Sequence, residues 1–393
     1  MAEDDYYWLW LCNIPGIGTA KLRKLLKAFR SAENIYKAGK SELSSVYGIN
    51  AEDVAAICKS KNSEQINGLV KTLREKHIGF VHANSPLYPA NLKNICDSPI
   101  ILYYRGKLPD SALFTVAVVG SRACTNYGRQ IAQKLCWEFS KMGVQVVSGL
   151  AMGIDGAAHK GSLEGGGYTC GVLGCGVDIC YPAVNIDLYN KMCERGCVLS
   201  EYAVGTKPFP WQFPMRNRII SGLADAVIVI EARKKSGSLI TVDQALEQGK
   251  DVYVVPGRIG DEVSEGCNEL IKNGAFVITE PGDIAESIRV SGKKTGYMDY
   301  RLQDNKFQGG KFKNDKLSVS INDSSHKINL SSNSLATQKN MVYSGLDLFP
   351  KSLEVIMNEN RLDIGTVTEI LLSLQLEGLV QEVSKNCYVR INI

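Results

Sequence analysis

Residues 115–127 read TVAVVGSRACTNY and place an apolar run, a glycine turn and the start of a helix in direct succession. Apolar residues 116–119 predict a strand, and the spacing after the turn predicts an amphipathic helix over 127–142. The turn and the helix N-terminus would present backbone N–H groups and a positive dipole end to an anion. The dinucleotide fingerprint G-x-G-x-x-G is absent, and Arg122 stands where a glycine would admit a pyrophosphate. We therefore expect an anion site that is not built for NAD.

The same alternation continues along the chain from about residue 114 to residue 289. Apolar strands separated by helix-length amphipathic segments are typical of a mainly parallel sheet covered on both faces. We therefore predict an α/β domain with a Rossmann-like doubly wound sheet, whose ligands lie at the carboxyl ends of the strands. The expected strands are Val116–Val119, Val144–Val147, Tyr168–Leu173, Val198–Leu199, Ala226–Ile230, Val252–Val255 and Phe276–Ile278.

The pattern divides the chain into four blocks. Residues 1–76 are helical and include IPGIG before an amphipathic helix, which resembles a helix-hairpin-helix (SAM-like) element; its turn either binds a nucleic-acid phosphate or only packs. Residues 77–290 hold the sheet domain and an N-terminal extension that we interpret as a connecting stretch. Residues 291–340 are rich in Ser, Asn, Lys and Gly and predict a flexible linker. Residues 341–393 show the helix, helix, hairpin order of a winged-helix domain, which binds DNA or protein.

Composition limits the possible functions. The chain has 393 residues, 45% of them hydrophobic and 22% charged, as in a globular protein of two or three domains. The net charge is +4, but residues 291–340 hold nine Lys/Arg and four Asp/Glu, so a nucleic-acid site elsewhere must come from local clustering. The acidic start lacks a signal peptide's basic region, and no run approaches the roughly 18 apolar residues of a membrane span. We expect a cytoplasmic protein with reduced thiols, no membrane association, no metal and no cofactor.

Two further loops fall where strands should end. In EARKKSGSLITVDQAL, residues 231–246, a helix opens at Ser236, Gly237 and Ser238, so that backbone N–H groups and two hydroxyls can converge on an anion. In SGLAMGIDGAAHKG, residues 148–161, the glycines allow close backbone approach and the aspartate would cap a helix. The residues expected to shape the pocket are Gly149, Gly153, Asp155 and His159.

The segment VGTKPFPWQFPMRNRIISG, residues 204–222, combines basic and aromatic side chains. Lys207 adds charge and the rings of FPWQF could stack on bases, which is the combination that binds single-stranded nucleic acid. The alternative is that the rings are buried in the core. Arg216 and Arg218 follow Pro214 at the start of a helix, where a spacing of two residues points them to different sides. One could reach a ligand while the other pairs within the protein.

Five segments together resemble the DNA-processing protein A family, DprA or Smf: VAVVGSR, SGLAMGID, FPMRNRIISGLADAVIVIEA, SGSLITVDQALEQGKDVYVVPG and SEGCNELIKNGA. The resemblance covers roughly residues 88–280. It implies a homodimer that binds single-stranded DNA in a basic pocket and loads RecA during natural transformation. It also implies that Arg122 is the central phosphate ligand, that Phe213 contacts a base, that Lys207 supplies a loop lysine, and that the dimer contact falls near Leu270 and Ile271. The DNA-binding residues so predicted are Gly120, Ser121, Arg122, Lys207, Phe213, Arg216, Arg218, Ser236, Gly237 and Ser238.

An enzyme is the competing hypothesis. The same pocket could belong to a nucleotide-binding hydrolase of the phosphoribohydrolase type, whose P-G-G-x-G-T-x-x-E loop supplies a catalytic glutamate. The comparable segment here offers Asp243 but no glutamate at that step, and no P-loop is present. His159 is the best candidate for a general base, and Asp155, four residues earlier, could hold its imidazole. A lone histidine on a helix is more often structural, so we expect a DNA-binding protein with no catalytic residues.

Overall fold

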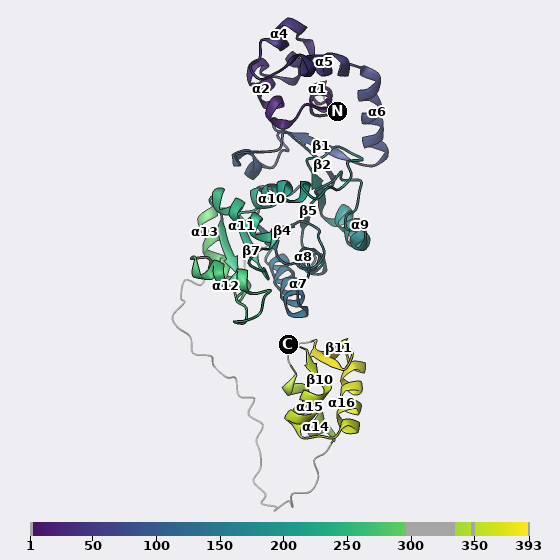
Figure 1. Cartoon of the computed structure of the whole chain (residues 1–393), viewed down its shortest axis with the longest axis vertical. Coiled ribbons are helices and arrows are strands. Elements are labelled where there is room, and N and C mark those ends of the chain that lie inside the picture. The colour runs from purple at the N-terminus through teal and green to yellow at the C-terminus, as the bar shows by residue number, and fades with distance from the viewer. Residues whose placement is uncertain (1–2, 296–334, 347–349, 392–393) are drawn as a thin grey trace, which may run out of the picture. The chain divides into compact units, whose positions relative to one another are not determined.

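The computed structural model describes residues 3–295, 335–346 and 350–391 (Figure 1). Their contacts form two compact units, one within Met1–Met298 and one within Asp299–Ile393. Most of the predicted linker, residues 296–334, lies outside the described residues. Across the described parts of the chain, no helix is both long and apolar enough to cross a membrane.

The larger unit begins with a helical region whose core includes Trp8, Trp10, Leu25 and Ile35. The predicted glycine turn joins the first two helices, and Gly16 there has a φ of 80°, a conformation that suits glycine. The helices are α1 (Glu3–Cys12), α2 (Thr19–Phe29), α3 (Ala32–Lys37), α4 (Lys40–Ser44), α5 (Ala51–Ser60) and α6 (Ser63–Glu75).

A nine-stranded sheet follows, in the order β1-β2-β6-β5-β4-β3-β7-β8-β9. All seven predicted strands are present, and the pairs from β6 to β9 are parallel. The prediction of a mainly parallel, doubly wound α/β sheet is therefore confirmed. The strands are β1 (Gly79–His82), β2 (Ile101–Gly106), β3 (Thr115–Val119), β4 (Gln145–Ser148), β5 (Thr169–Val172), β6 (Cys197–Ser200), β7 (Ala226–Val229), β8 (Asp251–Val254) and β9 (Phe276–Val277).

The first two strands correct the interpretation of the N-terminal extension as a connecting stretch. β1 pairs antiparallel with β2, and β2 pairs antiparallel with β6, so the extension adds two strands to the sheet. The short run GFVH of β1 carried no alternating pattern long enough to predict a strand. The partner of β2 lies about 95 residues later, so the pairing that stabilises it is not readable locally.

Helices cover both faces of the sheet (Figure 1). One face packs against α10, α11 and α12 and the other against α7, α8 and α13, with α9 beside β5 and β6. The bounds are α7 (Asn126–Lys141), α8 (Ile154–Glu164), α9 (Ile186–Arg195), α10 (Gln212–Leu223), α11 (Gly237–Glu247), α12 (Glu265–Lys272) and α13 (Ala285–Ser291), with 3-10 helices η1 (Ala90–Asn94), η2 (Ala183–Asn185) and η3 (Pro281–Ile284).

The order of the strands fixes where a ligand can bind. The chain runs outward from β3 through β4, β5 and β6, then returns to the other side of β3 to form β7. β3 and β7 are therefore adjacent, with Val119 opposite Val229 at their carboxyl ends. The loops after these two strands diverge to opposite faces of the sheet and leave a crevice, which is the usual ligand site of such folds.

The smaller unit packs three helices against a three-stranded sheet of order β10-β12-β11. Its core includes Val342, Ile356, Val367 and Leu371. The predicted helix, helix, hairpin order corresponds to the last two helices and the last two strands, while the first helix begins at Leu335, inside the predicted linker, and β10 was not predicted. The winged-helix assignment stays a prediction. The elements are α14 (Leu335–Gly345), β10 (Lys351–Ser352), α15 (Leu353–Asn360), α16 (Ile364–Leu376), β11 (Val380–Ser384) and β12 (Cys387–Arg390).

Candidate nucleic-acid interface

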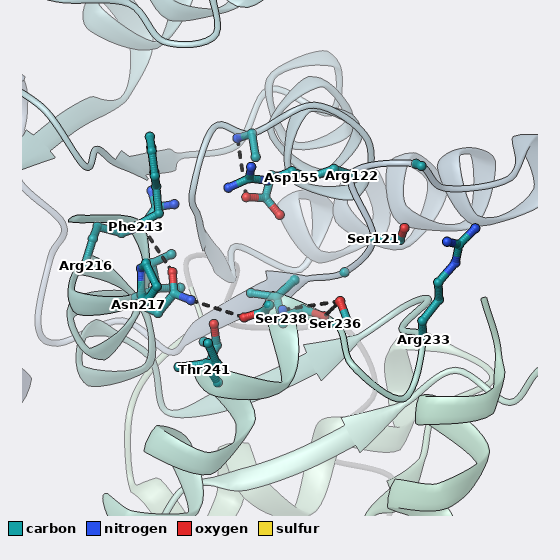
Figure 2. Close-up of a pocket in the computed structure, with 18 of the residues that line it drawn as sticks. Ser121, Arg122, Asp155, Phe213, Arg216, Asn217, Arg233, Ser236, Ser238 and Thr241 are labelled. Atoms are coloured by element: carbon teal, nitrogen blue, oxygen red, sulfur yellow. Dashed lines mark hydrogen bonds between the residues drawn. The ribbon is translucent and has the colours of Figure 1, made fainter. Parts of the chain in front are cut away.

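A cavity of about 560 Å³ opens at the carboxyl ends of β3, β4 and β7. Figure 2 shows its polar side chains approaching from the loop after β3, from α10 and from α11. The predicted residues that line it are Gly120, Ser121, Arg122, Asp155, Phe213, Arg216, Ser236, Gly237 and Ser238. Three loops that are separate in sequence therefore meet at one cavity.

The loop after β3 is held by close backbone packing. Ser121 N donates to Glu231 O at 2.7 Å, which ties the loop after β3 to the end of β7. Gly153 has a φ of 79°, and a Cβ there would lie 2.3 Å from Ser121 O. Only glycine allows this approach, because both the dihedral angle and the collision exclude a side chain. The fixed loop leaves the Arg122 side chain exposed at the cavity.

The N-terminus of α7 does not serve as the predicted anion site. Thr125 N donates to Glu231 Oε2 at 2.8 Å and Thr125 Oγ1 to Glu231 Oε1 at 2.5 Å, and Gly128 N donates to Thr125 Oγ1. A buried carboxylate from the end of β7 therefore already occupies this helix end. The prediction that these amides face a ligand is wrong, because Thr125 N faces Glu231, more than 100 residues later, and Gly128 N faces the hydroxyl of the N-cap residue Thr125.

The N-terminus of α11 takes this role in the cavity wall. Ser236 is the N-cap residue, and its side chain accepts from Ser238 N. The two hydroxyl oxygens lie 2.7 Å apart, and both residues line the cavity (Figure 2). Hydroxyls and amides at the positive end of a helix are suited to an anionic oxygen.

Arg216 supplies a buried positive charge. Its Nη1 donates to Gly149 O at 2.8 Å and also to Val172 O. A Cβ at Gly149 would lie 2.7 Å from Arg216 Nη2 and 2.6 Å from Asp155 Oδ2, so this glycine makes room for both side chains. Burial lowers the pKa of Arg216 to about 10, with a smaller lowering from the charge of Arg122 and an opposing effect of Asp155. The guanidinium remains charged at neutral pH.

Arg218 points to the other side of α10, as the two-residue spacing predicted. Its Nη2 lies 2.6 Å from Glu201 Oε2 and its Nε lies 3.3 Å from Asp97 Oδ2. Arg218 does not line the cavity, and neither does Lys207. Of the two arginines, Arg216 is therefore placed to reach a ligand and Arg218 pairs within the protein.

An aromatic pair forms another part of the wall. The ring centroids of Phe213 and Tyr181 are 5.4 Å apart, and the Arg122 guanidinium lies 5.4 Å from the Phe213 ring. Tyr181 is 45% exposed, so its face is available for stacking. Phe209 and Trp211 are 51% and 62% exposed and lie outside this wall. The alternative that these rings are buried in the core is wrong for both of them.

His159 and Asp155 do not act as a pair. His159 is fully buried outside the cavity wall, with Nδ1 2.7 Å from Thr169 Oγ1, and burial lowers the pKa of the imidazole to about 3. Asp155 Oδ2 accepts from Gly149 N at 3.2 Å and Ala151 N at 3.4 Å, and burial raises its pKa. Asp155 thus braces the loop after β4. The expectations that it holds the imidazole and caps α8 are both wrong.

Sequence reasoning missed five polar or aromatic residues of the wall: Tyr181, Asn217, Arg233, Lys235 and Thr241. Arg233 and Lys235 come directly before the predicted Ser236, so the position of this loop after a strand was a usable signal. Tyr181 offered no local signal, because its role depends on the approach of Phe213 from α10.

The cavity wall carries an excess of positive charge. Its basic residues are Arg122, Arg216, Arg233 and Lys235, and its acidic residue is Asp155. Arg233 lies 3.7 Å from Glu262, but both are exposed, so this pair neutralises little. Among the described residues, neither Arg122 nor Lys235 has an ion-pair partner. Such an arrangement can hold more than one anionic group.

The remaining predicted positions lie elsewhere. Leu270 and Ile271 are half-buried in α12 and pack against the core of the sheet. Over residues 3–295, 335–346 and 350–391, no cluster of His, Cys, Asp and Glu could hold a metal ion.

Comparison with known proteins gives matches over most of the chain. The model of the DNA recombination-mediator protein A family matches residues 79–289, and that of a SAM-like helix-hairpin-helix tandem matches residues 11–60. Protein Smf of Synechocystis sp. is 32% identical over 97% of both chains. DNA processing protein DprA of Streptococcus pneumoniae is 46% identical over 50% of this chain and 70% of the relative. The X-ray structure of that DprA superposes with a TM-score of 0.61, covering 73% of this chain and 98% of the other at 33% identity.

Proposed function

Because this chain belongs to the DNA recombination-mediator protein A family, as its motifs predicted, we propose that it binds single-stranded DNA in the cavity between β3 and β7 and takes part in DNA processing. The name of the DprA relatives supports a role in DNA processing. The observation that carries the proposal is the convergence of four basic residues and the two hydroxyl groups at the start of α11 around a single buried carboxylate.

The chemistry of the wall favours a single strand over a duplex. Arg122, Arg216 and the start of α11 suit backbone phosphates, while Phe213 and Tyr181 offer ring faces to bases. In a duplex the bases are stacked inside and cannot reach these rings. Stacking tolerates any base, so we expect weak sequence preference and strong salt dependence.

The family resemblance supports two further proposals about partners. We propose that DNA held here is delivered to RecA during natural transformation and that the protein acts as a homodimer. β9 is an edge strand beside α12, and Phe276 and Val277 on it are 54% and 43% exposed. Within residues 3–295, no strand pairs with the outer side of β9, and an edge of this kind shortly after Leu270 and Ile271 in the chain suits pairing with a second copy. We place this activity in the cytoplasm, because all twelve cysteines are free thiols and that compartment keeps thiols reduced.

We propose that the site is not catalytic. A general base needs a pKa near the working pH, whereas burial holds the pKa of His159 far below it. Asp155 accepts hydrogen bonds from two backbone amides and faces two arginines, so it is poorly placed to activate water. This arrangement disfavours the hydrolase of the phosphoribohydrolase type.

The test is fluorescence anisotropy of a labelled oligo-dT across a salt series, for the wild type and Arg122→Ala. Losing a charged phosphate contact should weaken binding by about 10- to 100-fold and reduce the slope of log K against log salt by about 0.7. Arg195→Ala removes the same charge from an exposed position outside the cavity and should bind like the wild type.

Competition identifies the ligand class. A duplex and free mononucleotides should displace the oligonucleotide poorly. Two results would overturn the proposal and favour the hydrolase. One is binding of the mononucleotide but not of the oligonucleotide, and the other is equal oligonucleotide affinity of the wild type and Arg122→Ala.

A further inference from the structure

A second cavity of about 550 Å³ lies beside the first and shares Arg122 with it. The loop after β4 separates the two: Ala151 lines the first, while Met152 and Gly153 line the second. The other walls of the second cavity come from α7, α8, η2 and α9. The two cavities are therefore neighbouring parts of one surface, with the Arg122 side chain between them.

The second cavity also carries a positive charge that the protein does not neutralise. Its basic residues are Arg122, Arg129, Lys160 and Lys191, against Glu164 and Asp187. Lys160 lies 3.7 Å from Glu164 one turn along α8, and both are exposed, so the pair contributes little. Glu164 also accepts from Gln133. In the described part of the chain, Lys191 has no ion-pair partner.

Apolar side chains lie among these charges. Met152 and Val184 are 51% and 73% exposed at the rim, and Ala157, Leu163 and Leu188 line the interior. Basic groups spaced around a partly apolar floor suit a chain with phosphates on one side and flat, weakly polar groups on the other. A free inorganic anion would not use the apolar surface.

We propose that the second cavity binds the sugar-phosphate backbone of the same DNA strand as it leaves the first cavity. Arg122 is the shared contact, and Lys160 and Lys191 neutralise the next phosphates. This inference rests on the proposed binding of single-stranded DNA. The bound strand runs from the first cavity across the loop after β4 into the second cavity. A strand long enough to reach both cavities therefore binds more tightly than a strand that fills only the first.

The experiment compares two labelled oligo-dT lengths, about 4 and about 16 nucleotides, chosen from the range of site sizes in single-strand binding proteins. Anisotropy across a salt series is measured for the full-length wild type and for K160A/K191A. The matched control is K134A/K141A, which removes two exposed lysines of α7 that line neither cavity. Both substituted lysines of the test variant are exposed, and tryptophan fluorescence melts verify that each variant folds.

The expected result depends on length. K160A/K191A should bind the short oligonucleotide like the wild type but bind the long one roughly tenfold more weakly, with a salt slope smaller by about 1.4. The control variant should match the wild type at both lengths. Equal weakening at both lengths, or a loss of affinity no larger than in the control, would contradict DNA binding by the second cavity but not DNA binding by the first. If the wild type binds neither oligonucleotide, the proposed function itself fails.

Discussion

Arg122 and Arg216 place two positive charges at one cavity in opposite surroundings. Arg122 is exposed and has no ion-pair partner among the described residues, whereas Arg216 is buried between two carbonyl oxygens and Asp155. Removing Arg216 would take from the buried Asp155 the larger of its two favourable arginine charges, which destabilises the protein as well as the site. Arg122 is therefore the residue whose loss reports on binding alone.

His159 predicts a specific dependence of stability on pH. Burial lowers the pKa of its imidazole to about 3, against the usual 6.5 of an unfolded chain. Below pH 6.5 the unfolded state therefore binds a proton at this residue that the folded state does not bind. The contribution of His159 to the free energy of unfolding is complete above pH 6.5 and is lost as the pH drops toward 3. From pH 7.5 to pH 5 we expect this residue alone to remove about 2 kcal/mol from the free energy of unfolding.

Urea unfolding of the wild type and His159→Asn at these two pH values checks this. All four tryptophans, Trp8, Trp10, Trp137 and Trp211, lie in the larger unit, so their fluorescence follows that unit alone. The variant should lose about 2 kcal/mol less than the wild type on acidification. His77→Asn, at an exposed position after α6, should keep the wild-type dependence. Identical pH dependence in all three proteins would refute the buried neutral imidazole.

At the scale of the elements, the close packing of the loop after β4 against the loop after β3 requires the glycine at position 153. Gly153→Ala introduces a Cβ 2.3 Å from Ser121 O and 2.6 Å from Arg122 O at a φ of 79°. The collision is with backbone, so the loop that carries Arg122 must move. We expect anisotropy to show at least about tenfold weaker binding of oligo-dT, comparable to loss of one charged contact.

Gly166→Ala is the matched control for this substitution. Gly166 has the same φ of 79°, but a Cβ there meets no atom within 4 Å. Both variants should lose about 1 kcal/mol or more of stability from the unfavourable dihedral angle. Only Gly153→Ala should lose DNA affinity. Equal affinities of the two variants would mean that the close approach of the loops does not position Arg122.

The strands and loops of the sheet show what the sequence could and could not predict. Buried parallel strands are continuous apolar runs, so the six strands from β3 to β8 and the place of the crevice were predictable, and the exposed edge strand β9 was found from its short apolar run. β1 was missed because it is a short antiparallel strand. The occupant of the α7 N-terminus, Glu231, comes from the loop after β7. Contacts between distant segments, such as Tyr181 with Phe213, decide which side chains line the cavity. Residue patterns predict elements, but not these contacts.

At the scale of the whole molecule, the candidate DNA site lies entirely within the larger unit. Every residue of both cavities falls within Met1–Met298, and the smaller unit has its own core. Residues 299–393 do include basic side chains of the predicted linker. Their charge could add a nonspecific attraction for long DNA without forming part of the site.

Truncation separates these two contributions. A chain of residues 1–298 should bind an oligo-dT of about four nucleotides within about twofold of the full-length affinity, because such a strand engages only the cavity. The salt slope for this short strand should also be unchanged. Tryptophan fluorescence melts of the truncated chain should match the full-length protein, which verifies that the larger unit is intact. Weaker binding of the short strand with an unchanged melt would mean that residues beyond 298 contact the bound strand. The site would then extend into the second unit.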